Sequence, residues 1–235
     1  MIDVRLADYE RVVFFTGAGM SAESGVPTYR GKGGTWSEYD PEQVACQAAF
    51  ERDPEHVWAF HNLRREAVAK CIPNSGHAIV AAAERAQPSV TVVTQNIDGL
   101  HQLAGSKTVH ELHGSLWGLR CGRCSWRGQS RAAPLLDLKC PDCGAYKRPD
   151  IVWFGDMLRM DVIQASQRAL ETCDLLVSIG TSAVVYPAAQ LPLIAKQAGA
   201  RLVEINPEPT PLSDAYEVLL RGPATEMLAR IADGL

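Results

Sequence analysis

Residues 17–31 read GAGMSAESGVPTYRG and follow the apolar run VVFF and Thr16. Gly17, Gly19 and Ala22 form the pattern G-x-G-x-x-A directly after this predicted strand. In dinucleotide-binding folds the first glycine permits a tight turn, the second lets a pyrophosphate approach, and the third small residue permits close helix–strand packing. Free N–H groups and the helix dipole would then favour an anion. The stretch therefore predicts a nucleotide-binding loop that opens a helix.

Short apolar runs and helical patterns alternate on both sides of this loop. The runs are rich in β-branched residues and lack the polar alternation of half-exposed strands. They cover residues 11–17, 89–96, 175–182 and 201–207. Ala-rich helical patterns cover 77–86, 162–173 and 187–200, and a last one covers 223–235. This order predicts an α/β fold, a Rossmann-like parallel sheet with helices on both faces.

Every predicted strand ends in small or polar residues. Thr16-Gly17, Thr94-Gln95-Asn96, Gly180-Thr181-Ser182 and Asn206-Pro207 stand at these ends. Open α/β sheets bind ligands at the carboxyl ends of their strands. Ordinary turn chemistry explains any single case, but the four together predict a shared pocket.

Two segments interrupt the alternation. Residues 32–74 contain a loop and two predicted helices, near 41–51 and 54–71, and residues 116–150 show little regular pattern. We expect these helical and zinc-binding inserts to form a small domain. Residues 1–31, 75–115 and 151–235 would then form the Rossmann-like nucleotide-binding domain.

Four of the seven cysteines form two C-x-x-C pairs, Cys121 with Cys124 and Cys140 with Cys143, with 15 residues between the pairs. In a reducing compartment this spacing predicts a zinc knuckle rather than disulfides. Four thiolates fill a tetrahedral Zn²⁺ site and leave no open position, so the metal is predicted to be structural. Its loss should unfold the insert.

Composition limits the other possibilities. The net charge of −4 argues against general nucleic-acid binding, which needs clustered Lys and Arg. The sequence contains no uncharged apolar stretch of about 18 residues that would predict a spanning helix. The start, MIDVRLADYERVVFF, lacks the features of a signal peptide. A cytoplasmic protein without membrane association is expected.

The pattern does not fit an ordinary NAD-dependent dehydrogenase. Such an enzyme usually carries an acidic residue at the end of its second strand, about 20 residues beyond the glycine loop. Asp40 and Glu42 lie in this region, but no strand precedes them. Hydride transfer is therefore not the predicted chemistry.

Several further motifs follow in a fixed order: TQNIDGLH (94–101), ELHGS (111–115), IVWFGD (151–156), GTSAVVYPA (180–188) and INPEP (205–209). With the glycine loop and the cysteine pairs, this set resembles the sirtuins, the NAD-dependent protein-lysine deacylases, over almost the whole chain. Its short length is similar to that of bacterial members. The resemblance implies that NAD is consumed: its nicotinamide–ribose bond is cleaved and the acyl group of a modified lysine passes to ADP-ribose. The implied partners are acylated-lysine proteins or peptides.

The resemblance also implies roles for individual residues. His113 in ELHGS takes the position of the catalytic base, a role suited to a side chain with a pKa near 6.5. Without the resemblance a core or turn histidine would be preferred, since five other histidines compete. Gln95, Asn96 and Asp98 would line the nicotinamide and ribose pocket, although Asp98 could instead cap the following helix.

The NAD-binding positions implied by the resemblance form a longer set. They are Gly17, Ala18, Gly19, Ser21, Ala22, Glu23, Thr28, Tyr29, Arg30, Trp36, Gln95, Asn96, Ile97, Asp98, Gly180, Thr181, Ser182, Asn206, Pro207 and Ala224.

The substrate peptide is expected to add a strand between two chain segments. By resemblance these are Val152-Trp153-Phe154-Gly155 and residues 183–186, which include Val185. Asp156 stands where Glu is common in the family, and the sequence alone offers no account of this change.

One sirtuin class, the desuccinylases and demalonylases, carries Tyr-x-x-Arg on a helix and grips an acyl carboxylate with this pair. The matching residues here are His61 and Arg64. Their spacing places both on one helical face, and Arg64 can bind a carboxylate bidentately. Histidine could donate one hydrogen bond, or add charge if protonated. We therefore expect activity on acetyl-lysine and on acidic acyl-lysines; the alternative is a solvated face with Arg64 and Arg65 near Glu66.

Two other functions remain open at this point. The same NAD cleavage could serve mono-ADP-ribosyl transfer to a protein. The chain could also be a zinc-knuckle interaction module on a nucleotide-sensing fold, without turnover.

Overall fold

The computed structural model describes residues 4–28, 34–87 and 89–234. Its main sheet has six strands in the order β3-β2-β1-β7-β8-β9, and all neighbouring pairs are parallel. The strands are β1 (Arg11–Thr16), β2 (Ser89–Thr94), β3 (Val109–Glu111), β7 (Leu175–Ile179), β8 (Arg201–Ile205) and β9 (Val218–Leu220). The predicted α/β class is confirmed.

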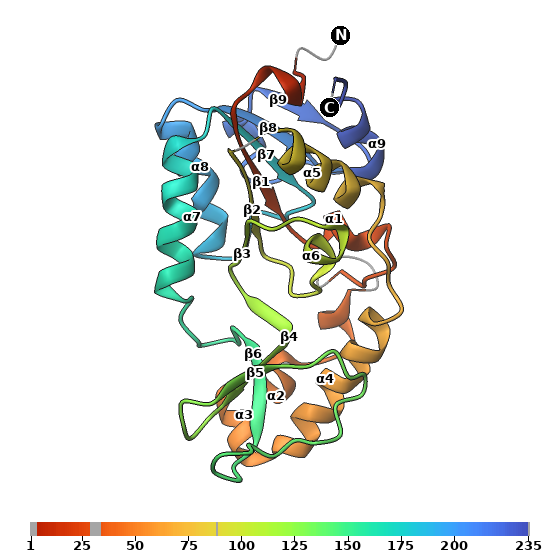
Figure 1. Cartoon of the computed structure of the whole chain (residues 1–235), viewed down its shortest axis with the longest axis vertical. Helices are drawn as coiled ribbons and strands as arrows, with labels where there is room; N and C mark the ends of the chain where they lie inside the picture. The colour runs from red at the N-terminus through yellow and green to blue at the C-terminus, as the bar shows by residue number, and fades with distance from the viewer. Residues whose placement is uncertain (1–3, 29–33, 88, 235) are drawn as a thin grey trace.

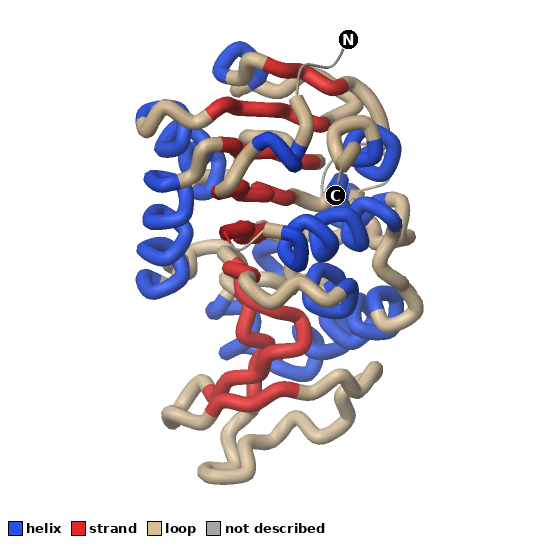
Figure 2. Tube along the Cα trace, turned by 45° about the horizontal axis from the view of Figure 1, so that its top comes forward, coloured by secondary structure: helices blue, strands red, loops and turns tan. Residues whose placement is uncertain are grey.

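Helices cover both faces of this sheet, as Figures 1 and 2 show. On one face lie α7 (Met160–Thr172) and α8 (Leu191–Gln197); on the other lie α5 (Ser75–Ala86) and α9 (Ala224–Ala229). The short helices α1 (Gly19–Ala22) and α6 (Leu100–Ala104) follow the ends of β1 and β2. Successive strand residues point to opposite faces, so Phe14 joins the core under α5 and α9 whereas Phe15 joins the core under α7 and α8.

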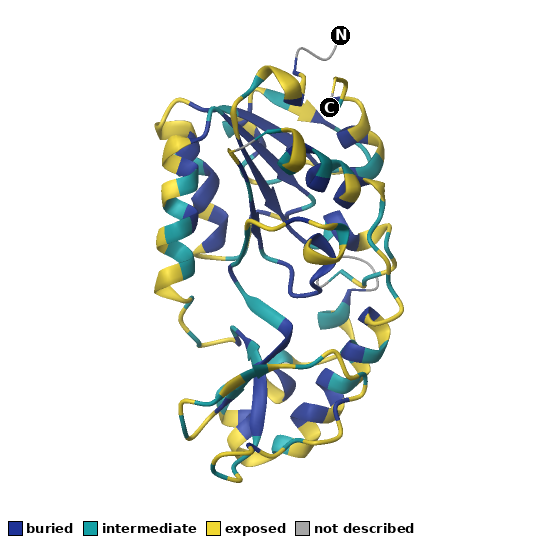
Figure 3. Ribbon diagram, viewed as in Figure 1, coloured by how far each residue is buried: buried dark blue, intermediate teal, exposed yellow. Residues whose placement is uncertain are grey.

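The central strands end level with one another. Thr16, the last residue of β1, pairs with Thr94 of β2 and with Ile179 of β7. β1 and β7 are buried along almost their whole length, which Figure 3 shows as dark ribbon. The register therefore brings the polar residues after each strand to one edge of the sheet.

A smaller lobe lies beyond this edge. It contains the antiparallel sheet β5-β4-β6, formed by β4 (Gly114–Cys121), β5 (Arg127–Gln129) and β6 (Lys147–Ile151). Helices α2 (Pro41–Val44), α3 (Gln47–Arg52) and α4 (Pro54–Val68) pack beside it (Figure 1). Trp58, Leu116 and Trp153 belong to the separate apolar core of this lobe.

Several elements differ from the sequence expectations. Strands β3 and β9 were not predicted because each has only three residues. Residues 116–150 contain regular strands despite their irregular pattern, and the expected helix at 41–51 is broken at Ala45 and Cys46. Within the helix expected at 187–200, only Leu191–Gln197 forms an α-helix. The domain boundaries stay a prediction; β4 begins at Gly114 and β6 ends at Ile151, one or two residues outside the expected insert.

Among the described residues, every helix is too short or too polar to cross a bilayer.

Candidate active site

A cavity of about 1070 Å³ opens at the carboxyl ends of the strands, between the main sheet and the small lobe. It brings together segments that are far apart in the sequence. Its lining includes most of the predicted residues: Gly17, Ala18, Gly19, Ala22, Glu23, Thr28, Trp36, His61, Arg64, Gln95, Asn96, Ile97, His113, Val152, Trp153, Phe154, Gly155, Gly180, Thr181, Ser182, Val185, Asn206, Pro207 and Ala224. The predicted shared pocket at the strand ends is thus present.

Two described residues that were predicted to bind NAD, Ser21 and Asp98, are buried and are not part of this lining. The predicted residues Tyr29 and Arg30 lie outside the described residues.

The glycine loop is shaped by a second loop rather than by free amide groups. A Cβ on Gly19 would lie 2.6 Å from the Gly180 Cα, and a Cβ on Gly17 would lie 2.7 Å from the Gly180 oxygen. The N–H groups of Gly17 and Gly19 donate to Ile179 O and Gly180 O. The N–H groups of Gly17 and Gly19 are therefore not free to bind an anion, and α1 is a single turn of four residues. The glycines are required because two backbones touch here.

His113 lines the cavity, and its ring has a defined tautomer. Its Nδ1 is 3.0 Å from the backbone oxygen of Gln95. A carbonyl oxygen only accepts, so Nδ1 carries the hydrogen and Nε2 of the neutral ring keeps its lone pair. Burial lowers the pKa of His113, while the Gln95 hydrogen bond acts in the opposite direction. The side chain is therefore an unprotonated base at neutral pH.

The glycine after this histidine has a local cause. Gly114 has a φ of +75°, and a Cβ there would lie 2.0 Å from the Asp150 oxygen. The His113 oxygen also accepts the N–H of Val152 at 2.9 Å. The HG pair thus joins the end of β3 to the segment that follows β6.

Hydrogen bonds among polar residues in and behind the cavity lining hold it in place. Asn96 Nδ2 donates to Gly17 O at 3.0 Å, and the Ser21 hydroxyl donates to Asp98 Oδ2 at 2.8 Å. Asp98 Oδ1 accepts the N–H of Leu100 at 2.8 Å. Burial raises the pKa of Asp98, partly offset by these two hydrogen bonds. Asp98 is therefore not the helix cap that the alternative interpretation expected, because the N-cap of α6 is Gly99 and receives no side-chain hydrogen bond. Asp98 instead closes a turn just before α6 and anchors the glycine loop.

Two more contacts hold the nucleotide-facing loops. Gln95 Nε2 donates to Thr181 Oγ1 at 2.9 Å and links the ends of β2 and β7. Glu23 accepts the backbone N–H and the hydroxyl of Thr225, at 3.0 and 2.7 Å, and so ties the glycine loop to α9.

The end of the cavity in the small lobe contains His61 and Arg64 of α4. His61 is fully buried, and its ring stacks on Trp153 with centroids 5.7 Å apart. Burial, with the nearby Arg64, Arg148 and Arg65, lowers the pKa of His61 well below its usual value. The sequence left open a charged, protonated His61; the lowered pKa shows that this ring is neutral at neutral pH. The Arg64 guanidinium lies 5.5 Å from the Phe60 ring centroid.

The alternative interpretation, that Arg64 and Arg65 lie on a solvent-exposed face of α4, is wrong for Arg65. Its guanidinium is buried and donates to the backbone oxygens of Leu116, Ser130 and Ala132 at 2.5, 2.5 and 2.8 Å. Burial lowers the pKa of Arg65 to about 10. This arginine fastens α4 to the small sheet.

The two expected peptide edges are not regular strands. β6 ends at Ile151, and beyond it only an isolated bridge pairs Phe154 with Cys46. Residues 183–186 form bends and turns. Trp153 is 3% exposed, so its side chain belongs to the core of the small lobe, whereas Phe154 is exposed.

Sequence reasoning missed several apolar residues that line the cavity: Ala45, Met157, Leu158, Met160, Ile163 and Pro187. Tyr186, which also lines it, belongs to the expected peptide edge at 183–186. Met157 and Tyr186 are 83% and 70% exposed. Such exposure of large apolar side chains indicates a binding surface. The one signal in the sequence was the apolar composition of MLRM (157–160) in a predicted loop.

The four predicted metal ligands converge in the small lobe. The sulfurs of Cys121, Cys124, Cys140 and Cys143 all lie within 4.8 Å of one another, and none forms a disulfide. Zn–S bonds of about 2.3 Å in a tetrahedron place sulfurs about 3.8 Å apart, so the cluster fits one Zn²⁺. The site lies outside the cavity lining and would serve the fold rather than the chemistry.

Comparison with known proteins agrees with this geometry. Residues 17–187 match the model of the Sir2 family. The chain belongs to the Sir2 family. It is 46% identical to NAD-dependent protein deacylase 2 of Pyrobaculum aerophilum, a match that covers 97% of this chain and 92% of the relative.

Solved structures show the same fold in this family. A Sir2 homologue in complex with NAD has a TM-score of 0.90 and 45% identity, and the match covers 96% of this Sir2-family protein and 89% of that chain. A Sir2 protein with a deacetylated p53 peptide and 3′-O-acetyl ADP-ribose has a TM-score of 0.85 and 33% identity, with 96% and 94% covered.

Proposed function

We propose that this Sir2-family protein removes acetyl groups and also acidic acyl groups, such as succinyl and malonyl, from lysine side chains, with NAD as co-substrate. Its family membership, with relatives at 40–46% identity over most of the chain, makes it an NAD-dependent protein deacylase. The range of acyl groups is our proposal.

The observation that carries the deacylase assignment is the tautomer of His113. Its free Nε2 belongs to the cavity that also contains the glycine loop and the residues after β2 and β7. When NAD is bound, its nicotinamide–ribose bond is cleaved and the acyl group passes to ADP-ribose. His113 Nε2 would take the proton of a ribose hydroxyl in this transfer.

Other residues would bind and orient the reactants. The Gln95 and Asn96 amides are held by Thr181 and Gly17, so their free hydrogen-bonding groups can orient a carboxamide or a ribose. Asp98 would act from behind the cavity, through Ser21 and the backbone of α6, rather than by direct contact. The apolar mouth around Met157 and Tyr186 would cover the lysine-bearing peptide and exclude water.

The support for acidic acyl groups comes from α4. Arg64 places a cation at the cavity, and the neutral His61 lies one helical turn before it. Arg64 can bind an acyl carboxylate bidentately. His61 is fully buried against Trp153 and would support this end of the cavity from behind. An acetyl group offers no carboxylate to these residues.

Arg64→Met tests the acyl proposal. It should lower kcat/KM for a succinyl-lysine peptide by about 10- to 100-fold, since hydrogen bonds to charged groups contribute about 1.5–3 kcal/mol. Turnover of the acetyl peptide should fall far less. Arg85→Met, at an exposed position of α5, is the matched control.

The assay should follow both nicotinamide and the modified peptide by mass spectrometry. Equal losses for acetyl and succinyl peptides in Arg64→Met would refute a carboxylate role. A peptide that gains ADP-ribose instead of losing its acyl group would refute deacylation itself.

A further inference from the structure

A buried carboxylate anchors the loop that follows β8. Glu204, within β8, is 2% exposed. Its Oε1 accepts the Thr210 hydroxyl and its Oε2 accepts the Ser213 hydroxyl, both at 2.6 Å. Arg221 Nη1 also donates to Oε2 at 2.6 Å. A buried charge is costly unless it is paired and hydrogen-bonded, so Glu204 fastens this loop and the residue after β9 to the sheet.

The groups that donate to Glu204 are also bonded to one another. Ser213 Oγ accepts Arg221 Nη2 at 3.1 Å and the backbone N–H of Thr210 at 2.8 Å. Thr210 Oγ1 accepts the N–H of Leu212 at 3.2 Å. Each hydroxyl therefore both donates and accepts, which fixes its orientation and holds the loop in one arrangement.

The same cluster holds the start of the loop, where Asn206 lines the cavity. The Asn206 N–H donates to Leu220 O at 3.1 Å, and Arg221 Nη1 lies 3.4 Å from the Asn206 backbone oxygen. The side chain of Asn206 is held as well, because Nδ2 donates to Glu208 O at 2.8 Å. A backbone oxygen only accepts, so the amide nitrogen must face it, and Oδ1 is left to accept a hydrogen from a ligand.

The strand order indicates which part of NAD lies at this loop. His113 follows β3 at one edge of the main sheet, the glycine loop follows β1 in the middle, and Asn206 follows β8 near the other edge. All three line the same cavity. With the reactive ribose at His113, the nucleotide would run across the strand ends and place its adenosine half at β8 and β9.

We propose that Glu204 and Arg221 are positioning residues for NAD: they hold the loop after β8 so that Asn206 Oδ1 accepts a hydrogen bond from a hydroxyl of the adenosine ribose. Neither Glu204 nor Arg221 is among the described residues that line the cavity, so both would act through Asn206 rather than by contact with NAD. The inference rests on NAD binding and is independent of the range of acyl groups proposed above.

Glu204→Gln is the direct test, because it keeps the shape of the side chain and removes the charge that Arg221 pairs. Calorimetric titration without peptide should give a Kd for NAD that is about three- to tenfold higher, as expected for one weakened hydrogen bond. ADP-ribose, which carries the same adenosine half, should lose affinity by the same factor. Arg221→Lys, which keeps the charge but loses the two-pronged contact with Glu204 and Ser213, should shift the Kd in the same direction.

Steady-state kinetics separate positioning from a general loss of structure. In Glu204→Gln the KM for NAD should rise by the same factor as the Kd, whereas kcat at saturating NAD and the KM for the acyl peptide should stay within about twofold of the wild type. A smaller folded fraction would instead lower kcat and leave the KM for NAD unchanged.

A double-mutant cycle tests the link to Asn206. Asn206→Ala should itself weaken NAD binding, because the accepting oxygen is lost. Adding Glu204→Gln to Asn206→Ala should cause no further loss, since the effect of Glu204 passes through Asn206.

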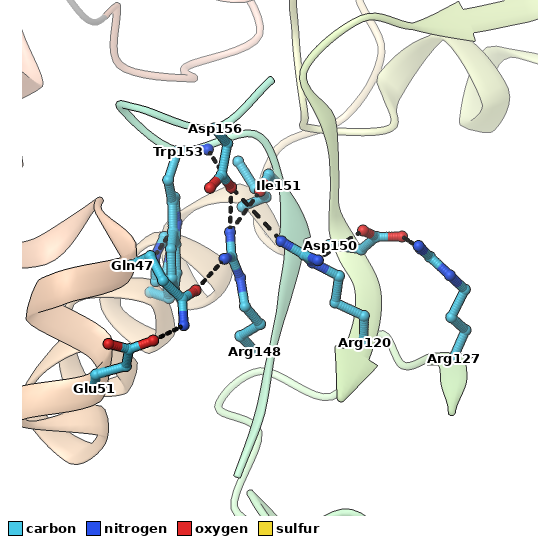
Figure 4. Close-up of polar contacts among 10 residues, drawn as sticks. Gln47, Glu51, Arg120, Arg127, Arg148, Asp150, Ile151, Trp153 and Asp156 are labelled. Atoms are coloured by element: carbon cyan, nitrogen blue, oxygen red, sulfur yellow. Dashed lines mark hydrogen bonds and ion pairs between the residues drawn. The ribbon is translucent and has the colours of Figure 1, made fainter. Parts of the chain in front are cut away.

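Arg127→Gln is the matched control. Arg127 donates to Asp150 at 2.5 Å in the small lobe, and Figure 4 shows this second arginine–carboxylate pair. Neither residue lines the cavity at the strand ends. Loss of this pair should therefore leave the Kd for NAD unchanged.

Two outcomes would overturn the inference. One is a wild-type Kd for NAD in folded Glu204→Gln, and the other is a full loss of affinity from Glu204→Gln in the Asn206→Ala background. If Glu204→Gln does not fold, Thr210→Val decides the question, because it removes one of the three hydrogen bonds to Glu204. It should raise the Kd for NAD about two- to threefold, and an unchanged Kd would overturn the inference. These titrations need no turnover, so their result is distinct from that of the Arg64→Met assay.

Discussion

At the residue scale, the close approach of Gly180 to the glycine loop leads to a prediction. Gly180 has a φ of +60°, and a Cβ there would lie 2.5 Å from the backbone of Gly19 and Met20. Gly180→Ala should therefore push the two loops apart and weaken NAD binding strongly, measured by calorimetric titration. Gly122→Ala, where an added Cβ meets nothing within 4 Å, should bind NAD normally. Equal NAD affinity in the two variants would contradict the loop contact.

The residue types in the sequence predicted where the pocket lies, but they did not predict the individual hydrogen bonds and packing contacts around it. The small and polar residues after β1, β2 and β7 do meet at one edge, because parallel strands in register bring their carboxyl ends together. The oxygens of Ile179 and Gly180, which accept the N–H groups of Gly17 and Gly19, could not be predicted, since they lie more than 150 residues away in the sequence. The burial of His61 depends likewise on Trp153, which is distant in sequence.

At the element scale, the attachment of α4 depends on Arg65. Arg65→Met should destabilise the protein by roughly 1–3 kcal/mol, since three backbone oxygens, that of Leu116 in a buried contact, lose their donor. Urea unfolding monitored by circular dichroism measures this change, with Arg85→Met as the exposed control. A loss below about 0.5 kcal/mol, typical of surface substitutions, would show that Arg65 does not anchor the helix.

Long elements were predictable, and short ones were not. The apolar runs of β1, β2, β7 and β8 and the patterns of α4, α5 and α7 are strong enough to locate these elements from sequence. β3, β5 and β9 were not predictable, because three-residue strands carry too little pattern. The longer strands β4 and β6 lie in a segment whose sequence shows little regular pattern. The cysteine spacing predicted the metal cluster without predicting the sheet that supports it.

At the scale of the whole molecule, stability should fall as the solution becomes more acidic. Burial lowers the pKa of His77 to about 4 and that of His101 to about 3, with the neighbouring His77 contributing to the latter. In the unfolded chain both have pKa values near 6.5, so below about pH 6.5 the unfolded state binds more protons. The stability that these neutral rings contribute is complete above pH 6.5 and is lost progressively toward pH 4.

Urea midpoints measured between pH 7 and pH 4 check this expectation. Comparison with His101→Asn isolates the contribution of one ring, since other buried groups are common to both proteins. The variant should lose less stability than the wild type over this range. Parallel curves would show that His101 is not held neutral by the fold.

The central claim is that His113 Nε2 is the base of an NAD-dependent deacylase. Its most direct test is nicotinamide release measured with and without an acyl-lysine peptide, in wild type and in His113→Ala. We predict release that requires the acyl peptide in the wild type, and loss of deacylated peptide and of its acyl-ADP-ribose product in His113→Ala, with zinc content and unfolding midpoint retained. Undiminished deacylation in that variant, or no peptide-dependent release by the wild type, would contradict the account.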